Sequence, residues 1–348
     1  MATDKQSSAA VTATAAAGGG SQGEPSRRPR IPRIVGLLAA LAALLVFPWM
    51  LPSGYWVDLA VQVLIWGALA SAWNIAAGYA GGLSLGHAAF LGVGAYTSTL
   101  LFLELGISPW LGMLAGAAFA GLLGLLLGAL TFRLRGPFFV LATLAFGVVV
   151  NILAVNLRGI TRGAAGLVVP FDGGWENMLF ASLEAYWYVG LALVALVVGT
   201  TLWIERSRFG YYLVAIREDE DAARSIGVRV VRWKLVAASL SAALTALAGT
   251  VYAQFVQYID PSSTTRFELS VQIALIAIVG GMGTAWGPLL GAIIVIPLGE
   301  ILRAEVGGGP ALMVYGFLLV VIVLAAPRGA LPGLRALLRW IGRRGAGG

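Results

Sequence analysis

The sequence is poor in the side chains that build most active sites. Its 348 residues include no cysteine and one histidine, His87. Disulfides and cysteine-ligated metal sites are therefore excluded, and a single imidazole does not form a metal site. No Asp or Glu lies close to His87 in the sequence to form a proton relay with it. We expect no catalytic residues and no metal site in this chain.

Lysine is almost as rare, because Lys5 and Lys234 are the only two in the sequence. Neither follows a glycine, so the chain lacks the Gly-Lys-Ser/Thr core with which a P-loop holds phosphate. No Rossmann fingerprint opens a strand–helix unit either. We predict that this chain binds no nucleotide itself.

Charged residues make up 11% of the sequence and hydrophobic residues 59%, whereas a typical soluble domain has about 25% charged residues. A soluble fold could not bury so much apolar surface. The net charge of +7 does not indicate nucleic acid, because the basic residues lie between and beside apolar runs. Strand-like alternation is missing, which excludes an outer-membrane barrel. The composition predicts an all-α polytopic protein in a lipid bilayer.

Ten apolar runs approach the length of roughly 20 residues that a membrane-spanning helix needs. They are residues 34–51, 57–75, 85–103, 108–130, 137–157, 185–204, 235–255, 269–282, 288–301 and 312–326. About ten crossings are therefore predicted, with a possible error of two, since the runs at 269–282 and 288–301 are short and split by glycines.

The polar segments divide the chain and orient it. Residues 1–33 are predicted to be a disordered extension, 34–327 a transmembrane domain and 328–348 a basic tail. An even number of crossings places both ends on one side. Arginine-rich loops alternate with nearly uncharged ones, so the positive-inside rule places both termini and the basic loop at 205–234 in the cytoplasm.

Few ionisable residues fall inside the spans. Asp58, Glu300 and Arg303 lie at predicted span ends, where they can pair or reach the interface. A proton- or ion-coupled carrier would be expected to bury a carboxylate. If the chain moves a solute, the energy is therefore predicted to come from elsewhere.

Glycines interrupt the apolar pattern at two places, residues 74–97 and 269–301. In the first, Gly78 and Gly82 separate two apolar runs, and Ser84 is predicted to cap the following helix. Broken helices at membrane depth expose backbone groups to a passing solute. A plain loop followed by a closely packed helix is the alternative, because small residues also allow close packing.

The candidate pathway residues come from both breaks. They are Asn74, Gly78, Gly82, Ser84, His87, Gly280 and Gly283. The second break predicts a broken or re-entrant helix buried by its neighbours. For His87 we favour a structural role, a hydrogen bond donated to a neighbouring helix.

The loop at 205–234 carries the most polar stretch of the chain. Ala222 and Ala223 are followed by Gly227. They are preceded by four acidic residues, Glu218, Asp219, Glu220 and Asp221. Acidic residues favour a helix N-terminus, so a short surface helix is predicted. A solvated charged loop is the alternative. The apolar residues 211–214 oppose it, because they favour a covered position, for which a partner protein is one candidate.

Several of these segments match a known pattern. Residues 78–90 read GYAGGLSLGHAAF, residues 208–210 and 215–218 read RFG and AIRE, and residues 280–284 and 287–288 read GGMGT and GP. Together they resemble the larger of the two paralogous permease subunits of ATP-binding-cassette (ABC) importers for branched-chain amino acids. The resemblance covers residues 56–327.

The resemblance implies how the chain is driven. Asp221, Ala222 and Ala223, with Gly227 four residues later, match the loop by which ABC permeases engage their ATPases, except that Asp221 stands where Glu is usual. The coupling residues would be those of the acidic helix: Glu218, Asp219, Glu220, Asp221, Ala222, Ala223 and Gly227. ATP and Mg²⁺ would be bound by two ATPase subunits, and this chain would hold no cofactor.

The resemblance also implies a paralogous permease partner, an extracytoplasmic binding protein and a place in the bacterial inner membrane. Branched-chain amino acids are the expected substrates. Urea or short amides and aromatic acids remain alternatives, as does a stand-alone secondary transporter.

Overall fold

The computed structural model describes residues 42–134, 136–171 and 173–306 and scattered residues between 314 and 330. The predicted extension at 1–33 and nearly all of the tail at 328–348 lie outside these residues. The chain divides into two units, Met1–Phe47 and Pro48–Gly348, and the second holds every element named below.

Seven helices in the described part of the chain are long and apolar enough to cross a membrane. They are α2 (Gly54–Asn74, continued by the π-helix Ile75–Tyr79), α3 (His87–Leu105), α4 (Pro109–Thr131), α5 (Pro137–Asn156), α7 (Leu183–Arg206), α10 (Val230–Val256) and α13 (Gly287–Val306). The predicted spans at 34–51 and 312–326 are only partly described, from residue 42 on in the first and at scattered positions in the second, so the expected count of about ten is not reached within the described residues.

Shorter elements connect these helices. They are α6 (Arg158–Thr161), a 3₁₀ turn (Gly163–Ala165), β1 (Leu167–Val168), α8 (Arg208–Glu218), α9 (Glu220–Ser225), β2 (Tyr258–Ile259), α11 (Pro261–Thr264) and α12 (Phe267–Gly280). The all-α expectation is correct apart from one antiparallel strand pair, in which Leu167 lies opposite Ile259.

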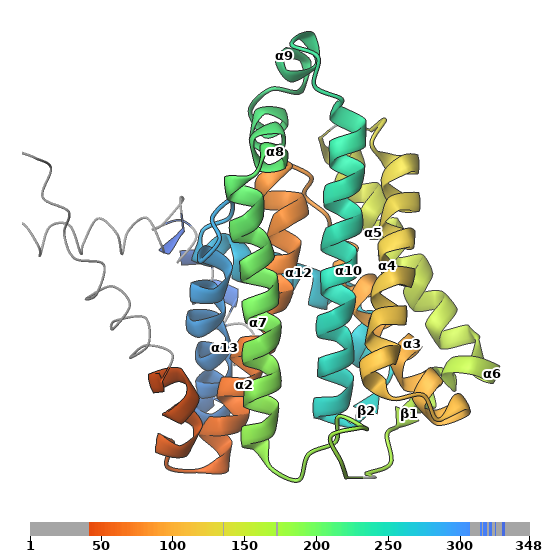
Figure 1. Ribbon diagram of the computed structural model, residues 1–348, viewed down its shortest axis with the longest axis vertical. Coiled ribbons are helices and arrows are strands. Elements are labelled where there is room, and N and C mark those ends of the chain that lie inside the picture. The colour runs from red at the N-terminus through yellow and green to blue at the C-terminus, as the bar shows by residue number, and fades with distance from the viewer. Residues whose placement is uncertain are drawn as a thin grey trace, which may run out of the picture. The chain divides into compact units, whose positions relative to one another are not determined.

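The bundle has two distinct ends, which Figure 1 shows at its top and bottom. Helices α8 and α9 extend beyond one end, and the strands β1 and β2 lie at the other. Helix α2 is the most buried of the candidate spans, and α7, α10, α12 and α13 all contact it. Helix α5 is the least buried and leaves most of its apolar surface open. A helix that is apolar all round can be buried in a bundle, as α2 is, or can span a membrane with its surface open, as α5 would.

Small residues let α3, α4 and α10 pack closely. A Cβ added to Gly94 of α3 would lie 2.2 Å from the carbonyl oxygen of Ala246 on α10. On the other side of the same glycine, a Cβ on Gly116 of α4 would lie 3.2 Å from the Gly94 Cα. The glycines of this apolar run therefore serve helix packing, since only small side chains allow backbones to approach so closely.

Helix α12 is shorter than a membrane-spanning helix. Its 14 residues span about 21 Å, less than the roughly 30 Å of a hydrocarbon core. Its first residues, Phe267 and Glu268, are exposed, and the Ser270 hydroxyl then accepts a hydrogen bond of 2.9 Å from the amide of Ala88, in the first turn of α3. Thr265, just before α12, packs against Gly92 of α3. A Cβ added to Gly92 would lie 2.2 Å from the Thr265 methyl group. This confirms the expectation of a broken or re-entrant segment.

The close approach at Gly94 can be tested against a glycine with open space. We expect Gly94→Ala to lower the stability of the purified protein by about 1–3 kcal/mol, because the methyl group would push α3 from α10. Gly199→Ala in α7 is the matched control, since no atom lies within 4 Å of the added Cβ. Thermal unfolding in detergent should show a lower Tm for Gly94→Ala only; equal Tm values would contradict this packing.

Candidate functional site

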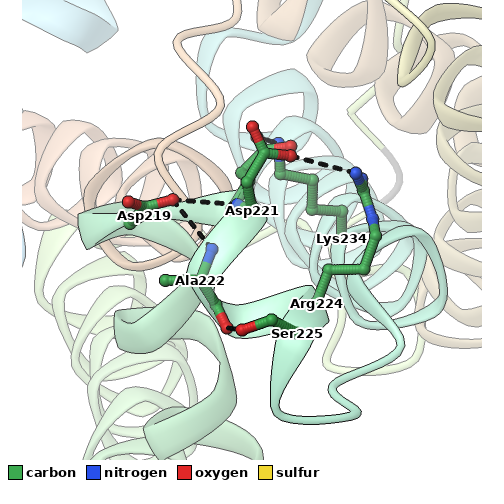
Figure 2. A network of polar contacts seen from close by, with 7 residues as sticks. Asp219, Asp221, Ala222, Arg224, Ser225 and Lys234 are labelled. Atoms are coloured by element: carbon green, nitrogen blue, oxygen red, sulfur yellow. Dashed lines mark hydrogen bonds and ion pairs between the residues drawn. The ribbon is translucent and has the colours of Figure 1, made fainter.

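A well-capped short helix, α9, forms the tip of the α8–α9 end. The Asp219 carboxylate accepts hydrogen bonds from the amides of Asp221 and Ala222, at 2.9 and 3.0 Å, as Figure 2 shows. The Ser225 hydroxyl donates to the Ala222 carbonyl at 2.7 Å. The chain then turns at Gly227, whose φ of +86° favours glycine. The predicted short helix is confirmed, and the solvated loop is not what forms.

One side of α9 packs against its own chain. Ala223 is buried with Ile216 of α8 and Val230 of α10. Glu220 forms an ion pair with Lys234 of α10, so the only lysine of the described residues fixes α9 to the bundle. Helices α8, α9 and the start of α10 thus form one small apolar core.

The other side of α9 faces away from the bundle. Asp221 pairs with Arg224 at 3.1 Å at the surface, and the Ile226 side chain is 77% exposed. Of the predicted coupling residues, Glu220 and Ala223 face inward, Asp219 caps the helix, Gly227 ends it, and Glu218, Asp221 and Ala222 lie at the surface.

The apolar residues at 211–214 are only partly in need of a partner. Leu213 is fully buried in the main core, whereas Tyr211 is 70% exposed. The expectation of cover is therefore confirmed for Leu213, and the chain itself rather than a partner supplies that cover.

The two glycine breaks meet at the α8–α9 end, although Asn74 and Gly283 are 209 residues apart in sequence. The Asn74 amide joins the two breaks: its nitrogen donates to the Thr284 carbonyl at 3.0 Å, and its oxygen accepts from the Gly283 amide at 2.7 Å. A Cβ on Gly78 would lie 1.9 Å from that amide oxygen. Any larger residue at position 78 would therefore displace Asn74. We call this contact of the segments 74–82 and 280–287 the glycine junction.

Two charged residues attach α7 and α8 to the glycine junction. The Glu205 carboxylate accepts from the Tyr79 hydroxyl at 2.6 Å and from the Ala285 amide at 3.2 Å, so it contacts both breaks. The Arg217 guanidinium donates to the Gly78 carbonyl at 2.9 Å. It also pairs with Glu218 at 2.7 Å, next to α9.

Sequence reasoning did not find these three contacts. Glu205 and Arg217 looked like ordinary residues of a charged loop, and Tyr79 like part of a glycine motif. One feature of the sequence pointed to these residues: Glu205 and Arg217 lie in the same loop, 205–234, as the acidic helix. Each lies near the end of a helix, Glu205 in α7 and Arg217 in α8.

Ser84 and His87 belong to a separate hydrogen-bond chain. Ser241 of α10 donates to the Ala72 carbonyl at 2.7 Å, so its oxygen accepts from His87 Nε2 at 2.8 Å, and His87 Nδ1 lies 3.1 Å from the Ser84 hydroxyl oxygen. The predicted hydrogen bond of His87 to a neighbouring helix is confirmed. The predicted cap is wrong: the N-cap of α3 is Gly86, and Ser84 lies one turn outside the helix.

The cavities near these residues differ in size. Ser84 and His87 line a cavity of about 30 Å³, with room for water but not for an amino acid. Gly82 also borders a pocket of about 560 Å³, which opens beside Lys234 and Glu220. Asn74, Gly78, Gly280 and Gly283 meet in the glycine junction instead. No group of three potential metal ligands occurs among the described residues.

Comparison with known proteins identifies transport permeases as relatives of this chain. The chain is 32% identical to the high-affinity branched-chain amino acid transport system permease protein LivM of Escherichia coli (strain K12), over 85% of this chain and 75% of the relative. It is 31% identical to the LivM protein of Salmonella typhimurium over the same shares. The fructose import permease protein FrcC of Rhizobium meliloti is 28% identical over 55% of this chain and 54% of its own length.

No solved structure matches the chain. Residues 55–326, which include all seven candidate spans except the first residue of α2, match the family of permease components of branched-chain amino acid transport systems. This chain is therefore a multi-pass membrane protein that belongs to the branched-chain amino acid permease family of ABC transporters.

Proposed function

We propose that this chain is the membrane-spanning subunit of an importer for branched-chain amino acids and that separate ATPase subunits drive it. The observation that carries the proposal is that Arg217, at the end of α8 next to the exposed helix α9, and Glu205, at the end of α7, both bond to the glycine junction. A chain without a P-loop needs such a link, because the energy of nucleotide hydrolysis must reach the spans mechanically.

The link can transmit movement because its parts are packed as a unit. Ala223 and the Glu220–Lys234 ion pair hold α9 on α8 and α10. Arg217 connects the end of α8 with the first break, and Glu205 connects the end of α7 with both breaks. An ATPase that pulls on α9 therefore shifts the glycine junction, where two backbone segments lack the rigidity of a continuous helix.

Sidedness follows from this assignment. The α8–α9 end faces the cytoplasm, where ATP is available, and its basic residues agree with the positive-inside rule. The β1–β2 end faces outward, toward an extracytoplasmic binding protein. A paralogous permease subunit completes the membrane part, and both termini are cytoplasmic in a bacterial inner membrane.

The substrate assignment rests on the relatives. The permeases that cover 85% of this chain are named for branched-chain amino acid transport. The fructose permease covers 55% of it, which shows that the family is broader than one substrate class.

The docking role of α9 gives the first prediction here. Ile226→Ser should reduce copurification of the ATPase subunits with the permease by about tenfold, because an exposed apolar side chain at an interface centre contributes about 1–2 kcal/mol. Ile160→Ser is the control, since Ile160 is 56% exposed at the opposite end. Unchanged ATPase copurification in Ile226→Ser would contradict docking at this face.

The Glu205 contacts give a second prediction. Glu205→Leu should leave the transporter assembled and hydrolysing ATP, but lower solute uptake per ATP by about tenfold, because the Tyr79 hydroxyl and the Ala285 amide lose their acceptor. Glu205→Gln keeps an acceptor oxygen and should stay close to wild type. The assay is paired uptake and hydrolysis in proteoliposomes. Normal uptake per ATP in Glu205→Leu would show that the junction does not transmit the movement.

A further inference from the structure

A pocket of about 510 Å³ opens near the β1–β2 end of the bundle, between α2, α10, α12 and α13. It lies far along α2 and α13 from the glycine junction, and neither the sequence nor the family assigns it a role. Its volume falls in the range of about 300–1,000 Å³ that is usual for small-molecule sites.

The floor of this pocket is apolar and closed. Trp66 of α2 is 8% exposed, and Val295 and Ile296 of α13 are buried below it. Phe255 of α10 and Leu269 of α12 complete the apolar wall. A branched aliphatic side chain placed here would be removed from water, with a gain of about 1.5–3 kcal/mol for full burial.

The mouth of the pocket carries charges of both signs. Glu300 and Arg303 of α13 pair at 3.1 Å, and Glu268 of α12 lines the same pocket. Glu268 pairs with Arg266 at 3.2 Å. Both pairs leave hydrogen-bonding capacity, because each arginine has further N–H groups and each carboxylate has a second oxygen. The side chains of Arg303 and Glu268 are 62% and 66% exposed, so both can reach a solute at the mouth.

Two amides add polar groups between mouth and floor. The Gln62 amide nitrogen donates to Asp58 at 2.7 Å, which leaves the Gln62 carbonyl oxygen as an acceptor. The Gln272 side chain of α12 also lines the pocket. Ionisable groups on membrane spans are costly unless they meet water or a polar ligand, so their position at a pocket indicates a solute site.

From this arrangement we infer that the pocket binds the solute on its way into the transporter and that the ligand is an aliphatic α-amino acid. The apolar floor takes the side chain, Glu268 and Glu300 take the ammonium group, and Arg303 takes the carboxylate. The inference rests on the proposed transport function and names where this chain touches the substrate.

The charge pattern separates this ligand from the alternatives. Urea and short amides have no apolar part for the floor and no charge for the ion pair. Aromatic acids have a carboxylate for Arg303 but no ammonium group for Glu268 and Glu300. A sugar offers hydroxyl groups but no charge to either ion pair. A zwitterion with an apolar side chain offers a group to each part of the pocket.

Leucine uptake by the complete transporter tests the site. Proteoliposomes would contain this chain, its permease partner and the ATPases, with the leucine-loaded binding protein supplied outside. Arg303→Gln and Glu300→Gln should each lower leucine uptake per ATP by about tenfold, the effect of one lost charge-assisted hydrogen bond. Arg303→Lys, which keeps the charge, should lose less. ATP hydrolysis stimulated by the binding protein should persist in all three.

Matched controls come from the same end of the bundle. Glu104→Gln in α3 and Arg158→Gln in α6 remove exposed charges outside the pocket and should transport like wild type. The double variant Glu300→Gln/Arg303→Gln separates a ligand site from a structural ion pair. A purely structural pair predicts wild-type uptake, because no unpaired charge remains, whereas the ligand site predicts uptake at least as low as in the single variants.

The outcomes also separate the two proposals. If the wild-type complex takes up no leucine, valine or isoleucine, the proposed transport function is wrong. If the wild-type complex transports leucine and the pocket variants match it, the transport function stands and the pocket is not the solute site.

Discussion

The glycine junction depends on one constraint: a backbone that leaves the helical path inside a membrane protein must find hydrogen-bond partners within the protein. Asn74 supplies two of them, since its amide bonds the Gly283 nitrogen and the Thr284 oxygen. Glu205 and Arg217 supply others. Because these partners come from α2, α7 and α8, satisfying the breaks also ties the coupling helices to the spans. Backbone groups of both breaks thus find partners within the protein.

The sequence predicted much of the fold and less of the site. Helices such as α4 and α10 follow from long apolar runs, and α9 follows from four acidic residues before an Ala-Ala pair. The contacts of Glu205 could not be predicted, because its partners Tyr79 and Ala285 lie 126 and 80 residues away. The cap at Ser84 was placed wrongly, since a serine before an apolar run caps a helix only if the helix begins at the next residue. Here the helix begins at His87.

The same limit applies to charged residues at span ends. Asp58, Glu300 and Arg303 each have a local explanation in sequence, an interface or an i,i+3 pair. Only the fold brings Gln62, Glu268 and Arg303 around one pocket with an apolar floor. The parts of the bundle therefore have different roles. Its β1–β2 end offers a mixed polar and apolar pocket, its middle is closed by small residues, and its α8–α9 end carries the helix that an ATPase can move.

The central claim is that α8, α9 and the glycine junction move together. The sequence has no cysteine, so pairs of introduced cysteines can carry spin labels without background. Labels at Tyr211 of α8 and at Leu83, beside the junction, should keep their distance when ATP binds to the assembled transporter, while labels at Tyr211 and Val148 of the outlying helix α5 should change theirs. A distance that changes between positions 211 and 83 but stays constant between 211 and 148 would contradict the account.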